Sequence, residues 1–330
     1  MSGKEHRIEQ ESVDVSLEEL YQRYRKYSFA IAYRMLGTVT DAEDVVQDCF
    51  VELKNKPLDD IHNPKAYVAK MTMNRCLNLL NSARKQRETY VGQWLPEPLG
   101  ESAELPADWL ERKDMISYAF LVLLEQLKPI ERAVFVLREA FQYDYKDIAE
   151  LLGKTESNCR QLFSRSRRIL SSGESALEAQ SSRNMNNSSR IKLLERFTTA
   201  FLAYDVTAML ELLAEQPVFV SDGGGNVHTV MRPMVVRKGV LALLTSRRVL
   251  TVLRERDVFH TVINGEVQLA FLEDGKVRET LCLRLTPDGE HIQSFYLMVN
   301  PDKLRYIHIG QKKQHAIKSN HQNSKNLESR

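Results

Sequence analysis

Apolar residues recur at intervals of three and four along the first half of the chain, whereas the second half alternates in short runs. The helical spacing covers residues 17–90 and 107–172 and predicts amphipathic helices through both stretches. After Arg190, one further helix is expected over residues 191–213 and another over residues 240–253. The remaining apolar runs predict strands at residues 218–221, 227–236, 258–263, 267–272, 277–285 and 292–299.

Two-residue turn signals separate several of these strands. Asn264-Gly265, Asp274-Gly275 and Asp288-Gly289 each pair a short polar residue with a glycine, which is typical of β-hairpins. One or two helices packed on a curved antiparallel sheet give an α+β domain. The expected fold class is therefore multidomain, with two all-α helical domains followed by an α+β domain.

Composition marks the joints between these domains. Residues 91–106 hold three prolines together with Gly92 and Gly100, which is typical of an irregular linker. A second stretch, residues 171–189, is rich in Ser and Asn. The expected division is a flexible N-terminus at 1–14, helical domains at 15–90 and 107–172, linkers at 91–106 and 173–189, an α+β domain at 190–311 and a disordered tail at 312–330.

Overall charge and cysteine spacing narrow the chemistry. The 330 residues carry a net charge of +2, so only the local distribution of charge can point to a nucleic acid. Cys49, Cys76, Cys159 and Cys282 lie far apart and are expected to be buried free thiols. The sequence has neither a signal peptide nor an apolar run of about 18 residues. We expect a cytoplasmic protein that uses no membrane, metal or cofactor.

The most specific local pattern is a helix-turn-helix. Residues 145–152 give a short helix one apolar face, Gly153 can leave it through a left-handed turn, and Thr155 can cap the next helix. That next helix carries four Arg and one Glu over residues 156–170. Arg can pair with guanine, and Asn or Gln with adenine, in a DNA major groove. The expected DNA-binding residues here are Ser157, Asn158, Arg160, Gln161, Ser164, Arg165 and Arg168. A solvated basic helix is the alternative.

Two helices of the first domain carry opposite charge. Residues 41–53 place an acidic ridge opposite a buried apolar stripe, and Thr40 or Asp41 is expected to cap this helix. The helix that starts near Pro64 is basic, with six Lys or Arg and one Glu over residues 65–88. Positive charge interleaved with amide side chains suits DNA phosphates and base edges. The expected contacts are Lys65, Lys70, Asn74, Arg75, Asn78, Arg84 and Lys85, and either face could instead be an ordinary solvated surface.

The order of these features resembles the extracytoplasmic-function class of bacterial sigma factors. The matching motifs are Tyr33-Arg34-Met35-Leu36-Gly37, Asp41 to Asp48, Asn74-Arg75-Cys76-Leu77-Asn78, and Tyr145 to Leu170. By this resemblance, Asp41, Asp44, Gln47 and Asp48 would dock on the clamp helices of RNA polymerase. The basic helix would read and help to open the minus-ten promoter element, and the helix-turn-helix would read the minus-thirty-five element. The loop at residues 58–63 could hold a captured base; Tyr67 stands where many relatives have Trp.

Three further motifs resemble a sigma-factor subgroup with a fused SnoaL-like C-terminal domain. They are Trp94-Leu95-Pro96-Glu97-Pro98-Leu99, Asp222-Gly223-Gly224-Gly225 and Asn300-Pro301-Asp302-Lys303-Leu304. In that subgroup the fused domain is thought to regulate the sigma factor in place of a separate anti-sigma protein. The resemblance implies an α+β cone domain, core RNA polymerase and promoter DNA as partners, and a free protein that is monomeric.

Trp94 suggests how a third domain could act on the other two. A Trp beside a rigid Pro-Glu-Pro segment is costly to leave in water and loses little entropy on docking. We expect Trp94, Leu95 and Pro96 to pack against the C-terminal domain and to fix the spacing of the two DNA-reading domains. The expected regulatory contacts on that domain are Asp222, Gly223, Gly224, Asn300, Pro301, Asp302 and Lys303. Docking of Trp94 on its own helical domain is the alternative.

Two other functions stay open at this point. The chain could be a helix-turn-helix regulator whose C-terminal domain senses a small ligand, or a DNA-binding module fused to a SnoaL-like enzyme. The acid/base candidates for an enzyme are Asp205, Asp222, His228, Asp257, His260 and His308. These residues form no recognisable local pair, so each is more simply a capping, turn or surface residue. We therefore expect a sigma factor that is not an enzyme.

Overall fold

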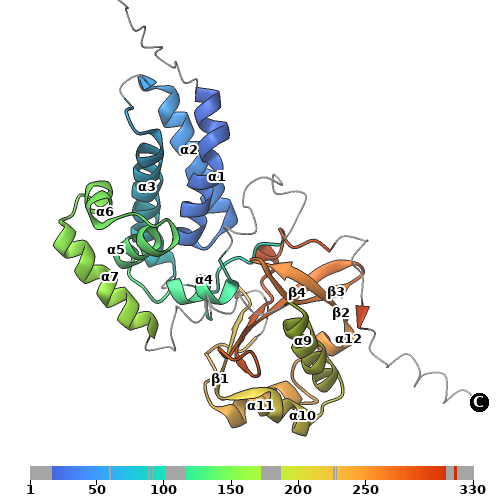
Figure 1. The fold of residues 1–330 in the computed structure, drawn as a ribbon. Helices are drawn as coiled ribbons and strands as arrows, with labels where there is room; N and C mark the ends of the chain where they lie inside the picture. Colours follow the sequence, from blue (N-terminus) through green and yellow to red (C-terminus); the bar gives the residue numbers. More distant parts are fainter. Residues whose placement is uncertain are drawn as a thin grey trace, which may run out of the picture.

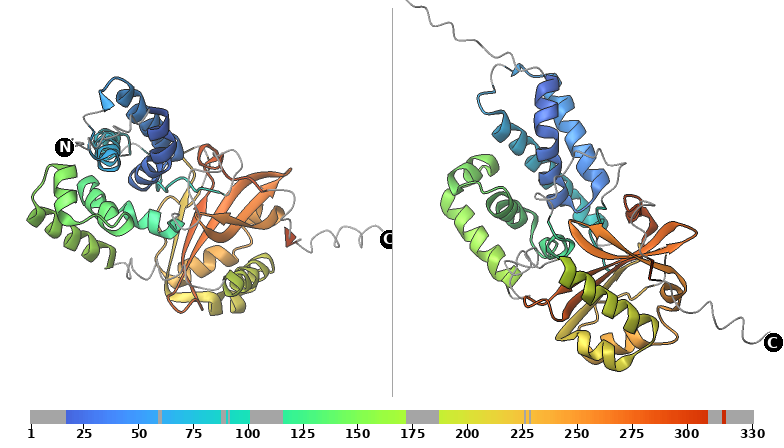
Figure 2. Two further views of the ribbon diagram at one scale, coloured as in Figure 1. Left: turned by 45° about the horizontal axis from the view of Figure 1, so that its top comes forward. Right: turned by 45° about the vertical axis from the view of Figure 1, so that its right-hand side comes forward.

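The computed structural model describes residues 17–58, 61–87, 90, 92–100, 116–171, 187–225, 227, 229–309 and 316–317. The expected flexible N-terminus, His228, residues 91 and 101–106 of the first expected joint, and most of the second joint and of the tail lie outside these residues. The described elements form two groups of helices and one sheet with its own helices, which sit against one another (Figures 1 and 2).

Three long helices form the first group: α1 (Leu17–Leu36), α2 (Val39–Lys54) and α3 (Pro64–Arg87). The apolar stripe of α2 is buried as expected, with Val46 and Cys49 fully covered. Gly37, at a φ of 76°, makes the corner between α1 and α2. The expected cap at Thr40 or Asp41 is wrong: α2 begins at Val39, and its N-cap residue Thr38 makes no side-chain capping bond.

The second group contains the helix-turn-helix. It consists of α4 (Tyr118–Leu124), α5 (Pro129–Phe135), the π-turn η3 (Val136–Ala140), α6 (Tyr145–Leu152) and α7 (Glu156–Ser171). Asp144 caps α6, Gly153 ends it at a φ of 60°, and Thr155 accepts a hydrogen bond from the backbone of Asn158. Both groups contribute to one continuous apolar core, so they are packed together in this conformation.

The third group is a mixed α+β domain. Its helices are α9 (Asn187–Leu202), α10 (Val206–Leu212), α11 (Arg237–Thr245), α12 (Thr251–Glu255) and the short η5 (Pro301–Lys303). Its strands are β1 (Leu213–Asp222), β2 (Asp257–Ile263), β3 (Glu266–Glu273), β4 (Lys276–Leu285), β5 (Ile292–Met298) and β6 (Ala316–Ile317). The spatial order is β1-β5-β4-β3-β2-β6.

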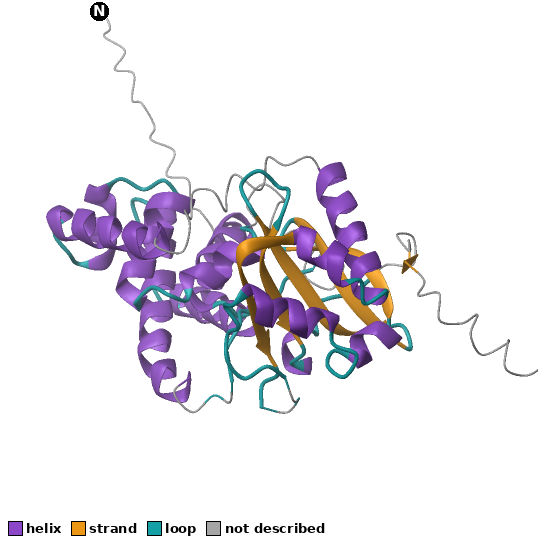
Figure 3. Ribbon diagram, turned by 90° about the horizontal axis from the view of Figure 1, so that it is seen from below, coloured by secondary structure: helices purple, strands orange, loops and turns teal. Residues whose placement is uncertain are grey.

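The two faces of this sheet have different roles. Helices α9, α10 and α11 cover one face (Figure 3), where Phe197, Phe201, Phe219 and Phe295 fill the space between helices and sheet. The opposite face buries Tyr296 and other residues against α4 and the segment around Leu95. The sheet therefore faces its own core on one side and the rest of the chain on the other.

Several details of the third domain differ from the sequence-based expectation. The sheet is not purely antiparallel, because β1 runs parallel to β5. The helix expected at 191–213 is broken by Tyr204, whose φ is 54°, and Asp205 caps a new helix. Residues 227–236 form no strand among those described and make one bridge, from Met234 to Phe219. The helix expected at 240–253 is divided into α11 and α12, and the expected disordered tail contains β6, which pairs with β2.

The hairpin signals are confirmed where the turns are tight. Asn264 and Gly265 both have positive φ, at 50° and 78°, and Asp274 and Gly275 repeat this at 52° and 72°. These values are those of the two-residue turns that match the twist of antiparallel strands. All four cysteines are buried free thiols, as expected.

Candidate functional site: exposed helix faces and a three-domain junction

The acidic ridge lies on the exposed side of α2. Asp41, Asp44, Gln47 and Asp48 are all exposed. The carboxylate of Asp48 accepts a hydrogen bond from Arg75 Nη1 at 2.9 Å, and Arg75 Nη2 lies 3.0 Å from Glu52 Oε2. Hydrogen bonds from Lys56 and Arg75 hold the pKa of Glu52 below its usual range. Arg75, expected to contact DNA, is therefore ion-paired to the acidic helix in this conformation.

The remaining basic-helix residues lie along α3. Lys65, Lys70, Asn74 and Asn78 are exposed, and the side chains of Arg84 and Lys85 lie outside the described part of the chain. Lys65 Nζ is 5.2 Å from the centre of the Tyr27 ring. The exposed face of α3 is thus positively charged, and its Lys65 ammonium packs over the ring of Tyr27.

A cavity of about 510 Å³ separates the start of α3 from the second helical group. One wall carries His62, Lys65 and Lys70, and the other carries Asp147 and Glu150 of α6. The helix that was expected to bind the minus-ten element therefore faces acidic residues of the helix-turn-helix unit. Tyr67, Phe141, Gln142 and Tyr143 complete the aromatic and polar lining.

Direct contacts hold the two helical groups together beside this cavity. The hydroxyls of Tyr27 and Tyr143 are 2.6 Å apart, and burial raises the pKa of Tyr27. The Tyr27 ring also meets the Phe141 ring edge to face at 5.2 Å. Arg132 of α5 donates to the backbone oxygen of Met35 at 2.8 Å. The two groups are closed on one another in this conformation.

The outer face of α7 presents the polar residues expected to read DNA. Ser157, Asn158, Arg160, Gln161, Ser164, Arg165 and Arg168 are all exposed. Arg160 lies 4.4 Å from the centre of the Tyr145 ring and 3.3 Å from Glu156. Arg165 Nε lies 2.9 Å from the buried Glu131 carboxylate. These contacts orient two arginines without removing them from the surface.

A buried junction joins the segment at residues 92–100 to all three domains. Asp222, at the end of β1, accepts hydrogen bonds from Tyr90 Oη at 2.6 Å, Leu95 N at 2.8 Å and Gly224 N at 2.9 Å. Lys303 Nζ lies 2.8 Å from the same carboxylate and donates to Leu95 O at 2.6 Å. The side chain of Asp222 is fully buried, so this carboxylate is the centre of the junction.

The glycine and Asn-Pro-Asp motifs shape this junction. Gly224, at a φ of 64°, approaches Asn300 so closely that an added Cβ would lie 2.5 Å from the amide nitrogen. Gly223 is likewise closed against the backbone of Val227. Asn300 caps η5 through a bond from Asp302 N, and Pro301 begins that turn. The three motifs thus converge to place Lys303 beside Asp222.

Trp94 lies between the first helical group and the third domain. Lys303 Nζ is 4.2 Å from the centre of the Trp94 ring. On the other side, a Cβ added to Gly37 would lie only 2.8 Å from Trp94 Cη2. The structure therefore places Trp94 against both partners that the sequence left as alternatives.

The backbone donors from Leu95 to Leu99 are fully used. Pro96 and Pro98 have no N–H, and the three remaining N–H groups all have acceptors. Leu95 donates to Asp222, Glu97 to the backbone oxygen of Gly37 at 2.7 Å, and Leu99 to Asn264 Oδ1 at 3.0 Å. This segment can be buried because each of its N–H groups has an acceptor and its two prolines have no N–H to satisfy.

Glu97 and Asn264 are two junction residues that the sequence did not single out for function. The Glu97 carboxylate accepts a hydrogen bond from Val39 N at 2.7 Å, and burial raises its pKa to about 7. Asn264 donates from Nδ2 to Tyr33 Oη at 3.0 Å, and Tyr33 in turn donates to Glu97 O at 2.8 Å. Asn264 carried only a turn signal, and Glu97 only its place between prolines.

Comparison with known proteins decides the family. Models of Sigma-70 region 2 and Sigma-70 region 4 match residues 20–86 and 117–170. The ECF RNA polymerase sigma factor SigJ of Mycobacterium tuberculosis is 32% identical over 214 residues, which cover 64% of this chain and 67% of that protein. The chain is an ECF sigma factor. Its partners are accordingly core RNA polymerase and promoter DNA, and the helix-turn-helix belongs to region 4.

Two other matches extend this result. The probable ECF RNA polymerase sigma factor SigI of M. tuberculosis is 35% identical over 162 residues, covering 48% of this chain and 56% of that protein. The crystal structure of M. tuberculosis SigJ superposes with a TM-score of 0.66 at 25% identity, covering 88% of this chain and 98% of that chain. The fused α+β domain is therefore part of a known sigma-factor architecture.

The acid/base candidates of this sigma factor are dispersed. Asp205 caps α10 and Asp222 is the centre of the junction. Asp257 and His308 are exposed, and burial lowers the pKa of the half-buried His260. A hollow of about 590 Å³ lies between α9 and α10 rather than inside the sheet, and Asp205 is the one candidate on its lining. The described residues thus do not assemble these groups into one catalytic set.

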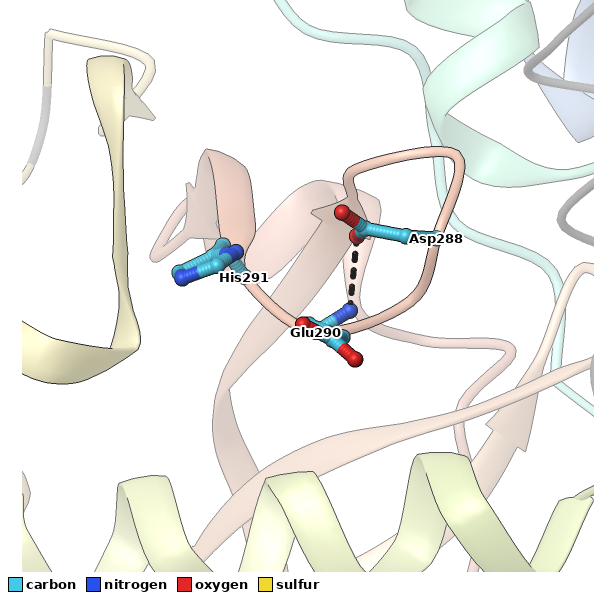
Figure 4. Close-up of side chains that lie close together, drawn as sticks. All are labelled: Asp288, Glu290 and His291. Carbon is cyan, nitrogen blue, oxygen red and sulfur yellow. Dashed lines mark hydrogen bonds between the residues drawn. The ribbon is translucent and has the colours of Figure 1, made fainter.

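Asp288, Glu290 and His291 gather at the β4–β5 turn, with potential ligand atoms within 4.8 Å of one another (Figure 4). The Asp288 carboxylate already accepts hydrogen bonds from Thr286 Oγ1 at 2.6 Å and Glu290 N at 2.9 Å, which lower its pKa. These bonds account for the position of Asp288 as a turn residue.

None of the described helices is long and apolar enough to cross a membrane.

Proposed function

We propose that this ECF sigma factor is controlled by its third domain, which holds the segment at residues 92–100 and thereby sets the relation between regions 2 and 4. The observation that carries the proposal is the buried Asp222 carboxylate. It binds Leu95 of the segment and Lys303 of the third domain at the same time. Regulation would act through these contacts, without substrate turnover, and in the cytoplasm, where polymerase is found.

Region assignments follow from the charged faces. Asp41, Asp44, Gln47 and Asp48 would dock on polymerase, the exposed face of α3 would contact the minus-ten element, and the outer face of α7 would contact the minus-thirty-five element. Those elements are about 25 base pairs apart, or about 85 Å along B-DNA. Regions that share one apolar core cannot span this distance, so the conformation described here would have to open.

Transcription in vitro with core polymerase and no other sigma factor tests the polymerase assignment. The double variant Asp44→Lys and Asp48→Lys should abolish promoter-specific transcripts because it reverses the ridge. Glu211→Lys with Glu215→Lys makes the same charge change on exposed residues of the third domain and should leave transcription intact. Equal loss in both pairs would contradict the assignment.

Variants of the third domain test regulation without turnover. Asp222→Asn should change transcription, whereas His260→Ala and Asp257→Asn, which remove other acid/base candidates, should not. Each variant is assayed at the same concentration of core polymerase, with unfolding midpoints as the control for folding. If His260→Ala alone reproduced the Asp222→Asn effect, a chemical role of the third domain would replace the contact mechanism.

A further inference from the structure

The turn between β2 and β3 contacts two other parts of the chain at once. Asn264 is 2% exposed, although it stands at a hairpin tip, where polar residues are normally in water. Its backbone N donates to Leu99 O at 2.8 Å, and its Oδ1 accepts from Leu99 N at 3.0 Å. Its Nδ2 donates to Tyr33 Oη of α1 at 3.0 Å. All of its polar side-chain atoms are therefore used outside its own hairpin.

We infer that this turn is a second docking site for the linker, separate from the Asp222 site. Leu99 exchanges two hydrogen bonds with Asn264, and Gly100 continues the pairing as an antiparallel bridge to Ile263. Leu95 and Leu99 are four residues apart, or about 13 Å in an extended chain. The third domain thus binds the Leu-Pro-Glu-Pro-Leu segment at both ends, at Leu95 and at Leu99. Between them, the Glu97 carboxylate accepts a hydrogen bond from Val39 N at the start of α2.

The hairpin geometry does not require the Asn264 amide. The next hairpin has the same backbone form at Asp274-Gly275, with a φ of 52° against 50° for Asn264, and Asp274 is exposed. Turn formation therefore explains the left-handed conformation but not the burial of the amide. The amide supplies the acceptor that the Leu99 N–H needs once that group is buried.

The site also reaches region 2, directly at Tyr33 of α1 and, through the linker residue Glu97, at the start of α2. Tyr33 Oη receives the bond from Asn264 and donates to Glu97 O, whose side chain binds the first residue of α2. Burial of the Tyr33 hydroxyl raises its pKa, so it stays neutral and keeps its proton for donation. The β2–β3 turn is thereby linked to the helix that carries the acidic ridge. The regulatory meaning of this link rests on the proposed function; the docking itself does not.

Amide hydrogen exchange on the full chain separates the two sites. Asn264→Gly keeps a residue that accepts positive φ and removes the amide, so exchange at Leu99 should accelerate on the order of tenfold to a hundredfold. Asp274→Gly is the matched control and should leave Leu99 unchanged. Asp222→Asn weakens the acceptor of the Leu95 N–H, so it should accelerate exchange at Leu95 more than at Leu99. Slow exchange at Leu281 and Leu269, which pair in the centre of the sheet, verifies that each variant is folded.

Two results would overturn the inference. One is a Leu99 exchange rate in Asn264→Gly that equals the unsubstituted chain or is matched by Asp274→Gly. The other is equal acceleration at Leu95 and Leu99 in both Asn264→Gly and Asp222→Asn, which would mean one undivided site. Transcription measured on the same variants distinguishes the proposals: accelerated exchange with unchanged transcription supports the docking site and contradicts the proposed regulation.

Discussion

The carboxylate of Glu97 accepts a hydrogen bond from the backbone N–H of Val39, the first residue of α2, at 2.7 Å. A helix start ordinarily relies on a nearby Ser, Thr, Asp or Asn to satisfy its free N–H groups. Here the acceptor comes from the linker instead. The first N–H group of the helix with the acidic ridge therefore has this acceptor only while the linker is docked.

The first prediction concerns pH. Burial raises the pKa of Glu97 from 4.5 to about 7, so between these values the folded state holds a proton that the unfolded state has released. Below about pH 4.5 the Glu97 carboxyl is neutral in both the folded and the unfolded state. Between about pH 4.5 and 7 it ionises only in the unfolded state, so the free energy of unfolding falls as pH rises. The difference corresponds to about 3 kcal/mol as an order of magnitude. Urea unfolding from pH 5 to 7.5 should show this fall, and Glu97→Gln should flatten it. An unchanged pH slope in Glu97→Gln would falsify the assignment.

The second prediction concerns the Asp222–Lys303 pair. Asp222→Asn removes the carboxylate that pairs with the buried Lys303 ammonium, and breaking a buried ion pair by removing one member costs about 3–5 kcal/mol. Limited proteolysis at residues 92–100 should accelerate, and the third domain should lose stability. Asp274→Asn, at an exposed carboxylate of the β3–β4 turn, is the control and should behave as the unsubstituted chain. Adding Lys303→Met to Asp222→Asn removes the uncompensated charge and should recover part of the stability. Failure to recover any would contradict the pairing argument.

Local signals in the sequence predicted local structure well. The cap at Thr155, the left-handed Gly153 and the apolar stripe of α2 are each set by residues within or next to one helix, so spacing alone identifies them. The Asn-Gly and Asp-Gly turns are local in the same sense. The parallel pairing of β1 with β5 was missed because no turn signal connects strands so far apart in the chain.

Contacts between distant parts of the chain, as at the junction, have no local signal of this kind. The segment at residues 95–99 was identifiable as rigid and in need of a partner, and its contacts with Asp222 and Lys303, 127 and 208 residues away, were expected through the motifs of the family resemblance. Its contact with Asn264, 165 residues away, was not expected, because no local signal connects the two residues. Asn264 fulfils its turn role and its docking role with one residue type, so the turn signal concealed the second role. Glu97 was concealed in the same way between two prolines.

The third prediction uses glycine. Gly37→Ala would place a methyl group 2.8 Å from Trp94 Cη2 at a φ of 76°, so we expect the Trp94 ring to shift. Gly275→Ala is the matched control, with a φ of 72° and open space around it, and carries only the backbone cost of about 1 kcal/mol. Intrinsic Trp fluorescence should shift to longer wavelength in Gly37→Ala, as Trp94 becomes more exposed, and transcription should change as in Trp94→Ala. A shift of equal size in Gly275→Ala would mean that backbone strain, and not displacement, is responsible.

The fourth prediction concerns the closed arrangement of regions 2 and 4. The Tyr27 and Tyr143 hydroxyls form a hydrogen bond at 2.6 Å, and a hydrogen bond of this kind contributes about 1 kcal/mol, or about a fivefold change in the ratio of closed to open forms. Tyr143→Phe keeps the ring and removes the bond, so it should favour the separated state. Energy transfer between dyes at Val51 and Lys146, on exposed faces of α2 and α6, should then fall, and core polymerase should bind at lower sigma concentration.

A double-mutant cycle decides whether the hydroxyl pair is the cause. Because both hydroxyls belong to one bond, Tyr27→Phe added to Tyr143→Phe should have little further effect on energy transfer. Additive changes would show that each tyrosine acts through separate contacts, such as the edge-to-face packing of Tyr27 on Phe141. High salt should leave the hydroxyl effect intact, whereas it should weaken any contribution from Asp147 and Glu150 facing Lys65 and Lys70 across the cavity. The salt series therefore shows whether the neutral hydrogen bond between the tyrosines or the charge attraction across the cavity keeps region 4 against the basic helix.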